Sequence, residues 1–245
     1  YFRHDGDDWT GIDVNAPLVT GDRIYSGFGG RVEVQLAPAV YTRFGPDTEL
    51  DLVELGPATT HVQVPLGRAI FRVRRDPGPE HVEIDTPAVA LVVKQSGVYR
   101  VEVEIGGRTV VRVHQGEVLG HCGSESFTID AGHEVVVDGI GNEARWQGVS
   151  YSGLDEFVEW ADARDLGVAG AKSYRHVSTD IYGAEDLDYH GEWEHRPTFG
   201  WVWRPTTVPV GWAPYTTGRW IWNDPWGWTW LDAAAWGWAP FHYGR

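Results

Sequence analysis

The chain has 245 residues, of which 42% are hydrophobic, and this is enough apolar surface for one large core or two modest cores. Its 35 acidic and 20 basic residues give a formal net charge of -15, which disfavours binding to nucleic acid or to an anionic membrane. No apolar run approaches the roughly 18 residues that a membrane-spanning helix needs. Because methionine is absent, we expect Tyr1 to be a processed or internal boundary, with any export signal upstream of it.

The first half of the chain is rich in short runs of Val and Ile that alternate with polar residues and are separated by Gly and Pro. Such runs are typical of half-buried strands, so we expect residues 18 to 138 to be all-β. The predicted strands cover residues 31–36, 49–55, 69–74, 98–105, 109–114 and 133–138. Cys122 is the single cysteine, which excludes an intramolecular disulfide and a Cys-x-x-Cys site.

The clearest local pattern is "VYRVEVEI" at residues 98 to 105. Its alternation places Tyr99, Val101, Val103 and Ile105 on one face, while Arg100, Glu102 and Glu104 share the other face. Gly106 and Gly107 then provide a turn into residues 109 to 114. The pattern predicts a β-hairpin.

A helical spacing appears near residue 150. Leu154, Phe157, Val158 and Ala161 recur at the interval of one helix face, and Ser152 and Asp155 have the spacing of a capping box. We expect one short helix that links the two halves of the chain.

Beyond this helix the sequence is dominated by tryptophan and repeats itself. Residues 193 to 238 hold 11 of the 14 tryptophans. "GEWEHRPTFGWVWRP" from Gly191 aligns with "GRWIWNDPWGWTWLD" from Gly218, and "GWAPYTTGR" from Gly211 aligns with "GWAPFHYGR" from Gly237. The repeat is about 27 residues long, and its Trp-x-Trp alternation with Gly and Pro at the boundaries predicts tandem β-hairpins.

Two hypotheses account for the tryptophans. In the first, indoles replace aliphatic residues as the core of a small module. In the second, some of them form an exposed surface for a protein partner, a sugar or a quaternary amine. We expect most to be core and the two "GWAP" segments to be turns that carry exposed anchors, with Arg219 and Arg245 stacked on rings. The candidate binding residues are Trp201, Trp203, Trp212, Tyr215, Arg219, Trp228, Trp230, Trp238, Phe241 and Tyr243.

The remaining polar residues show no spacing that is specific for catalysis, a metal ion or a cofactor. The histidines match neither H-E-x-x-H nor a finger pattern, and "GFGGR" at residues 27 to 31 is followed by a strand rather than the helix of a phosphate site. "DGDD" at residues 5 to 8 resembles the opening of a calcium loop, but the later ligands are absent, so we interpret it as a solvated turn. The sequence therefore predicts a protein that is not an enzyme and has no cofactor.

Residues 17 to 139 resemble a FecR-type domain in the order and spacing of several short motifs. The motifs are Gly21-Asp22-Arg23, Leu66-Gly67, Thr86-Pro87, Tyr99-Arg100-Val101, Gln115-Gly116-Glu117-Val118 and Ala131-Gly132. The second half resembles the tryptophan-rich module of unknown function that accompanies FecR domains in some exported bacterial proteins. The resemblance rests on "LDEFVEWADARD", "YGAEDLDYHGEW" and the two "GWAP" segments.

The resemblance implies a mainly β protein: a FecR-like domain, solenoid-like or sandwich-like, at residues 1–145, a linker with a short helix at 146–172, and a tryptophan-rich repeat module at 173–245. It also implies an exported location, in the bacterial periplasm or at the cell surface. FecR-type regulators relay a signal to a cytoplasmic sigma factor, but this sequence shows neither their anti-sigma region nor their transmembrane helix. We therefore expect a scaffold or accessory subunit that docks onto an envelope protein or assembly through its tryptophans, with carbohydrate or cell-wall binding as the alternative.

Overall fold

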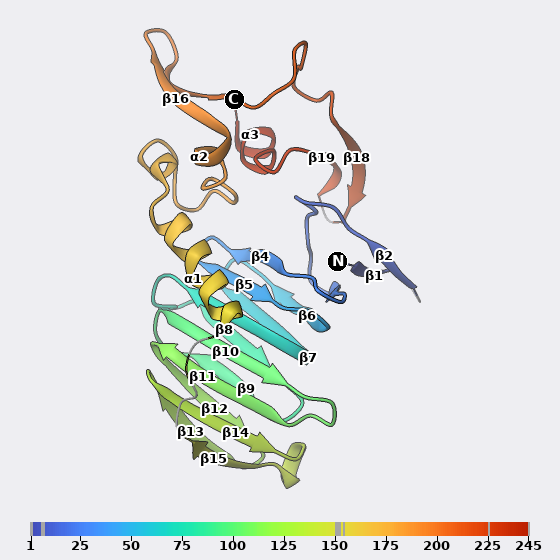
Figure 1. Ribbon diagram of the computed structural model, residues 1–245, viewed down its shortest axis with the longest axis vertical. Helices are drawn as coiled ribbons and strands as arrows, with labels where there is room; N and C mark the ends of the chain where they lie inside the picture. The colour runs from blue at the N-terminus through green and yellow to red at the C-terminus, as the bar shows by residue number, and fades with distance from the viewer. Residues whose placement is uncertain (1, 6–7, 150–152, 154, 225, 245) are drawn as a thin grey trace. The chain divides into compact units, whose positions relative to one another are not determined.

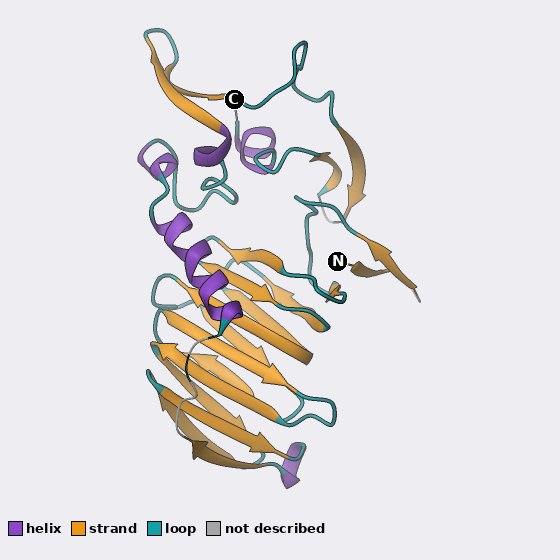
Figure 2. Ribbon diagram, viewed as in Figure 1, coloured by secondary structure: helices purple, strands orange, loops and turns teal. Residues whose placement is uncertain are grey.

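A computed structural model describes the chain except for residues 1, 6–7, 150–152, 154, 225 and 245. The fold has two compact units, which we describe separately. The first unit comprises Tyr1–Ile12 and Leu18–Ala161, and the second comprises Asp13–Pro17 and Asp162–Arg245. Strands dominate the first unit, whereas hairpins and short helices form the second (Figures 1 and 2). Over the described residues, no helix combines the length and the apolar character needed to cross a bilayer.

The described strands of the first unit form one 15-stranded sheet. The six strands predicted from alternation are confirmed. The strands are β1 (Phe2–Asp5), β2 (Asp8–Gly11), β3 (Arg23–Ser26), β4 (Val32–Ala37), β5 (Val40–Phe44), β6 (Thr48–Leu55), β7 (Thr59–Val73), β8 (His81–Asp85), β9 (Ala90–Val93), β10 (Gly97–Val103), β11 (Thr109–Gln115), β12 (Glu117–Cys122), β13 (Glu125–Asp130), β14 (His133–Asp138) and β15 (Arg145–Val149). A 3-10 turn, η1 (Gly141–Glu143), precedes β15.

The long strand β7 joins two layers of this sheet. Its first half pairs with β6 and, in parallel, with β8, while its second half pairs with β5 and β10. The halves meet at Gly67, whose φ of 95° is unfavourable for other residues, and a Cβ atom there would overlap Thr48. Aliphatic residues from both layers fill one shared core, which includes Leu50, Ile84 and Val111. The first unit is therefore a sandwich-like β-domain.

The predicted hairpin at residues 98 to 114 is confirmed, but one detail of its pattern is wrong. β10 pairs with β11 through a turn in which Gly106 and Gly107 both have positive φ. The strand ends at Val103, so Ile105 lies outside it and is 92% exposed. On the opposite face Arg100 is buried, because the helix that follows the sheet packs there.

That helix is α1 (Glu156–Ala169), and Asp155 caps it directly. The Asp155 Oδ1 atom accepts hydrogen bonds from the backbone N–H groups of Phe157 and Val158, both at 3.0 Å. The predicted capping box, with Ser152 as the cap and Asp155 as the third helical residue, is therefore wrong. Ser152 and Leu154, the first residue of the predicted apolar face, lie outside the described residues. Arg100 donates to Asp155 Oδ2 at 2.6 Å and holds the pKa of that carboxyl at about 2.

The second unit contains two β-hairpins connected by short helices and loops. The first hairpin consists of β16 and β17, and the second of β18 and β19. The elements are η2 (Lys172–Arg175), α2 (Leu187–His190), β16 (Gly191–Arg196), β17 (Gly200–Pro205), β18 (Gly218–Asn223), β19 (Gly227–Asp232) and α3 (Trp238–Tyr243). β16 begins at Gly191 and β18 begins at Gly218, and β17 and β19 begin at Gly200 and Gly227, so the predicted 27-residue repeat is the hairpin.

The first glycine of each hairpin makes room for an indole ring. A Cβ atom at Gly191 would lie 2.5 Å from the Trp203 ring, and one at Gly218 would lie 2.6 Å from the Trp230 ring. Each would also overlap a carbonyl oxygen of the partner strand. The Gly-x-Trp start of both repeats is therefore a packing requirement.

Residues 13 to 17 belong to the second unit although they lie near the start of the chain. The Asn15 side-chain amide donates to the carbonyl oxygens of Asp232 and Ala234, at 3.3 and 2.7 Å. Asp13 forms an ion pair with Arg219 at 2.6 Å. This early segment is thereby attached to the base of the second hairpin. In the predicted "DGDD" turn, Gly6 and Asp7 lie outside the described residues, and Asp5 pairs with Asp8 across β1 and β2.

Candidate functional site

Cross-strand pairing sorts the tryptophans of each hairpin into an inner pair near the base and an outer pair near the tip. The inner pairs are Trp193 with Trp203 and Trp220 with Trp230. Trp230 is only 6% exposed, and its Nε1–H donates to Asp232 Oδ2 at 3.0 Å. Trp203 is half-buried, and its Nε1–H donates to the Leu187 carbonyl oxygen at 3.0 Å. The two inner rings on the second strands therefore have structural roles.

The outer pair of the second hairpin is exposed. Trp222 and Trp228 face each other across β18 and β19, with ring centroids 5.8 Å apart and planes at 86°. They are 61% and 65% exposed. Alternation places Trp220 on the same face, and Tyr215 stacks parallel to Trp220 at 6.4 Å. We call Tyr215, Trp220, Trp222 and Trp228 the aromatic surface.

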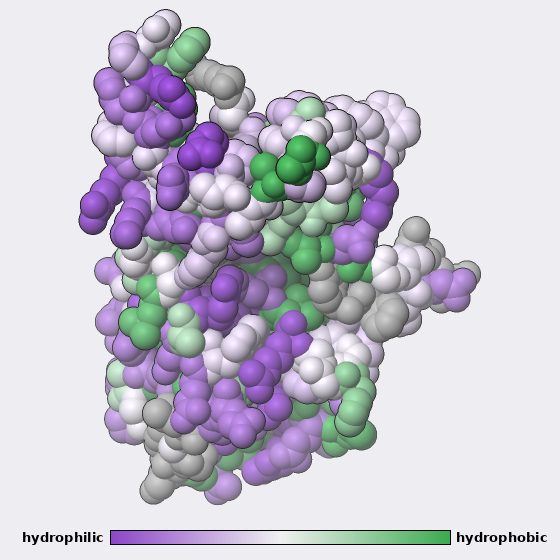
Figure 3. Space-filling model, turned by 45° about the horizontal axis from the view of Figure 1, so that its top comes forward, coloured by the Kyte–Doolittle hydropathy of each residue, from purple (hydrophilic) through white to green (hydrophobic). Residues whose placement is uncertain are grey.

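The first hairpin carries a smaller exposed area. Its outer pair is His195 with Trp201, and His176 packs on Trp201 at 4.5 Å and on Trp193 at 4.7 Å. An exposed aromatic ring precedes the turn glycine in both hairpins, Phe199 in the first and Trp226 in the second. Tryptophan and tyrosine lie near the middle of the hydropathy scale, so the area around β18 and β19 is pale rather than green in Figure 3.

A carboxylate lies at the edge of the aromatic surface. The Trp222 Nε1–H donates to Asp224 Oδ1 at 3.1 Å. In the described part of the chain Arg219 forms the ion pair with Asp13 and not the predicted stacking on a ring, and Arg245 lies outside the described residues. The surface is therefore apolar and aromatic with a polar edge, as at the centre of a contact area.

The two "GWAP" segments differ in structure, although both are predicted as turns. Residues 211 to 217 form turns, with Tyr215 at a φ of 62°, whereas residues 238 to 243 form the helix α3. Trp212, Trp238 and Phe241 are half-buried, and Trp212 and Phe241 pack on the buried Trp236. Tyr243 is exposed. These segments contribute mainly to the small aromatic core of the second unit.

His242 on α3 lies against the second hairpin. Its Nε2 atom is 3.1 Å from the Trp230 carbonyl oxygen. Partial desolvation lowers the pKa of this histidine, because contact with the hairpin disfavours the charged imidazolium, although the side chain remains exposed.

The structure thus separates the ten predicted residues into groups. Trp201, Tyr215, Trp228 and Tyr243 are exposed rings, and Arg219 is exposed and paired with Asp13. The other five, Trp203, Trp212, Trp230, Trp238 and Phe241, are buried or half-buried. Sequence reasoning missed Trp220, Trp222 and Trp226. The signal was present for Trp222, since the repeat alignment predicts a hairpin in which it pairs with Trp228.

Comparison with known families identifies both halves. Residues 22–119 match the family described as FecR protein, and residues 184–245 match a family of unknown function, DUF6600. The chain carries a FecR domain followed by a DUF6600 domain. The FecR domain lies within the first unit and the DUF6600 domain within the second.

The solved structures that resemble the chain are distant. Two crystal structures of a "putative anti-sigma factor" from Parabacteroides distasonis share 16% and 15% sequence identity with it, each with a TM-score of 0.46. Each alignment covers 53% of this chain and 60% of the other, so the chain spans less than two thirds of that protein's length. No curated protein matches the chain.

Proposed function

We propose that the protein is an envelope accessory subunit that docks onto a protein partner through the aromatic surface of its DUF6600 domain, with the FecR domain as a scaffold. The observation that carries the proposal is the exposed Trp222–Trp228 pair, together with Trp220 and Tyr215 on one hairpin face. Tryptophan and tyrosine dominate binding energy at protein interfaces, because they bury large areas and lose little side-chain entropy. The FecR match supports an envelope location and a non-enzymatic role.

The hairpin also limits the conformational cost of docking. Trp220 contacts the buried Trp230 edge to face at 5.5 Å, and Tyr215 contacts both Trp230 and Phe241. Trp220 and Tyr215 are therefore held by the rings beneath them before any partner binds. Such pre-organisation strengthens binding, since fewer rotamers must be fixed on association.

Carbohydrate binding is the second candidate, and one observation favours it. The Tyr215 and Trp220 rings are parallel within 3° and both are more than half exposed, with Asp224 nearby in the chain as a polar group. The edge-to-face geometry of Trp222 and Trp228 weighs against it, since a sugar ring stacks best on flat, coplanar indoles. We therefore place protein docking first.

The test compares the exposed pair with an exposed ring elsewhere. A photo-reactive cross-linker at position 228 should capture a defined envelope protein, and W222A/W228A should abolish that complex while leaving the circular dichroism of the fold unchanged. F28A is the matched control, because Phe28 is a fully exposed ring of the first unit. Retention of the complex by W222A/W228A would overturn the proposal. Saturable quenching of tryptophan fluorescence by glycans, lost in the same variant, would support the carbohydrate alternative instead.

A further inference from the structure

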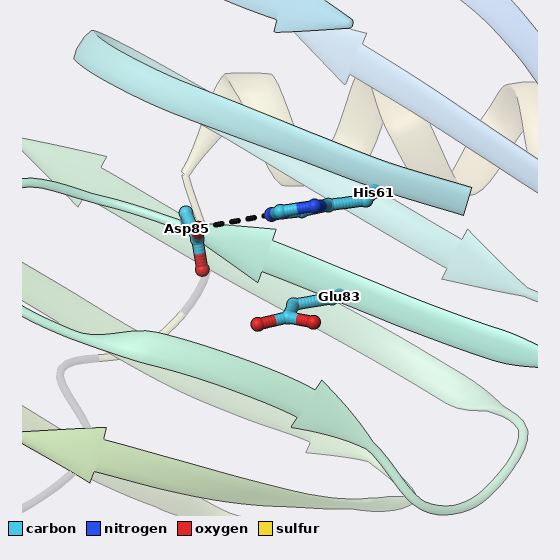
Figure 4. Close-up of side chains that lie close together, drawn as sticks. All are labelled: His61, Glu83 and Asp85. Carbon is cyan, nitrogen blue, oxygen red and sulfur yellow. Dashed lines mark hydrogen bonds and ion pairs between the residues drawn. The ribbon is translucent and has the colours of Figure 1, made fainter. Parts of the chain in front are cut away.

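A cluster of metal-ligating side chains lies on the outer face of the first unit. His61 on β7 pairs in register with Glu83 on β8, and Gln63 pairs with Asp85. Because side chains alternate along a strand, His61, Glu83 and Asp85 share the face opposite to the buried Val62 and Ile84. Figure 4 shows the three side chains gathered on these neighbouring strands.

The distances within the cluster suit a shared ion. One donor atom of each residue lies within 4.8 Å of the other two, and His61 Nε2 is 2.9 Å from Asp85 Oδ2. Zinc binds nitrogen and oxygen ligands at about 2.0–2.2 Å, which places neighbouring ligand atoms roughly 3.4 Å apart. Small rotations of three side chains would close the remaining gap.

The surroundings of the cluster differ from those of an ordinary surface ion pair. The three side chains are half-buried, and Asp85 Oδ1 is buried with no hydrogen-bond partner in the described part of the chain. A dehydrated carboxylate oxygen is costly unless a donor or a cation compensates for it. His81 Nε2 lies 2.9 Å from Glu83 Oε2 and supplies an outer contact of the kind that orients metal-binding carboxylates.

We propose that His61, Glu83 and Asp85 bind one divalent transition-metal ion, of the zinc class. The imidazole nitrogen favours zinc or its neighbours over calcium and magnesium, which prefer six or more oxygen ligands. Three protein ligands leave one tetrahedral position for water. The ion would cross-link β7 and β8, the parallel strand pair of the first unit.

Calorimetric titration of the untagged, chelator-treated full chain with zinc chloride tests the proposal. We expect saturable binding of one ion per chain at neutral pH and a rise in melting temperature. H61Q and D85N should each weaken binding at least about tenfold. H121Q should bind as the wild type does, because His121 lies on β12, is exposed and contacts Ser126.

Three results would overturn the proposal. The first is a wild-type chain that shows no saturable binding. The second is unchanged zinc affinity in both H61Q and D85N, which would place the ion at other histidines. Calcium and magnesium titrations test the selectivity of the site, and the third result is a calcium affinity that equals the zinc affinity and is unchanged in H61Q. Circular dichroism of each variant checks that the fold is intact.

Discussion

The two hairpins of the DUF6600 domain share one strand register but cover their aromatic faces differently. In the first hairpin, Trp193 donates from Nε1 to Ser173 Oγ, and Trp203 donates to the Leu187 carbonyl. The preceding segment, with η2 and α2, therefore binds the inner indoles. In the second hairpin, Tyr215 and Phe241 pack against Trp230 from flanking segments, whereas Trp222 and Trp228 are exposed to solvent.

This difference shows that the repeated sequence specifies the hairpin, whereas the flanking residues determine which of the two hairpins has an exposed aromatic face. Position 195 of the first hairpin corresponds to position 222 of the second, and the residues there are histidine and tryptophan. The first copy has a Trp–His pair with His176 packed beside it, whereas the second has two exposed indoles. The second hairpin is therefore the better candidate for binding. The inner indoles of the first hairpin are bonded to the preceding segment.

The largest expected effect comes from truncating the inner indoles. W230A should lower the free energy of unfolding of the second unit by about 3–5 kcal/mol, because it removes a buried ring and leaves a cavity. W203A should cost roughly half as much, since Trp203 is only half-buried. Urea denaturation followed by tryptophan fluorescence measures both.

The exposed Trp228 serves as the control for this pair. W228A should change the free energy of unfolding by less than about 0.5 kcal/mol. If W228A proved as destabilising as W230A, the division into structural inner rings and a free outer pair would be wrong, and the aromatic surface would have to be part of the core.

The glycines that open the hairpins should show the second largest effect, and it should be equal in the two copies. G191A and G218A each place a Cβ atom against an indole ring and a partner carbonyl, which should cost about 1–3 kcal/mol in the free energy of unfolding. G148A is the control, because a Cβ atom at Gly148 meets nothing within 4 Å. Thermal unfolding of the three variants tests this, and a neutral G218A would contradict the close packing of Trp230.

Alternation and repeat register predicted much of the fold from the sequence. The six strands, the turn at Gly106 and Gly107 and the 27-residue hairpins follow from periodicity alone, because these features depend on local backbone preferences. The burial of Arg100 was not predictable in this way, since it depends on α1 packing on the outer face of β10. The same limit applies to α3, whose sequence repeats that of a turn.

The candidate sites were predictable only in part for the same reason. Which tryptophans are exposed depends on the segments that cover each hairpin, and those segments do not repeat. The metal-ligating cluster was missed because the ligands were sought at helical or finger spacing. In "HVEID", His81, Glu83 and Asp85 alternate on one strand face, and the parallel neighbour that brings His61 beside them is a tertiary pairing.

A smaller loss of stability should follow from weakening the attachment of residues 13 to 17 to the second hairpin. N15G removes two hydrogen bonds to Asp232 and Ala234 and tolerates the positive φ of this position, so it should cost about 1 kcal/mol. V14A is the control, since Val14 is exposed. Hydrogen exchange should show faster opening of β18 and β19 and unchanged β16 and β17. Equally faster hydrogen exchange in both hairpins would contradict the specific attachment of residues 13 to 17 to the second hairpin.

The smallest effect should be a pH dependence specific to the second hairpin. Partial desolvation lowers the pKa of His242, so the folded state binds a proton on this imidazole less readily than the unfolded chain, which takes one up near pH 6.5. Its stabilising contribution is therefore complete above that pH and is lost as the pH falls toward the folded-state pKa. The side chain is exposed, which keeps the effect small. Thr216 occupies the matching position of the other "GWAP" segment and does not titrate.

The urea concentration at the unfolding midpoint of the second unit should decrease between pH 7 and pH 5, and H242Q should reduce that decrease. An identical fall in H242Q would assign the pH dependence to other groups.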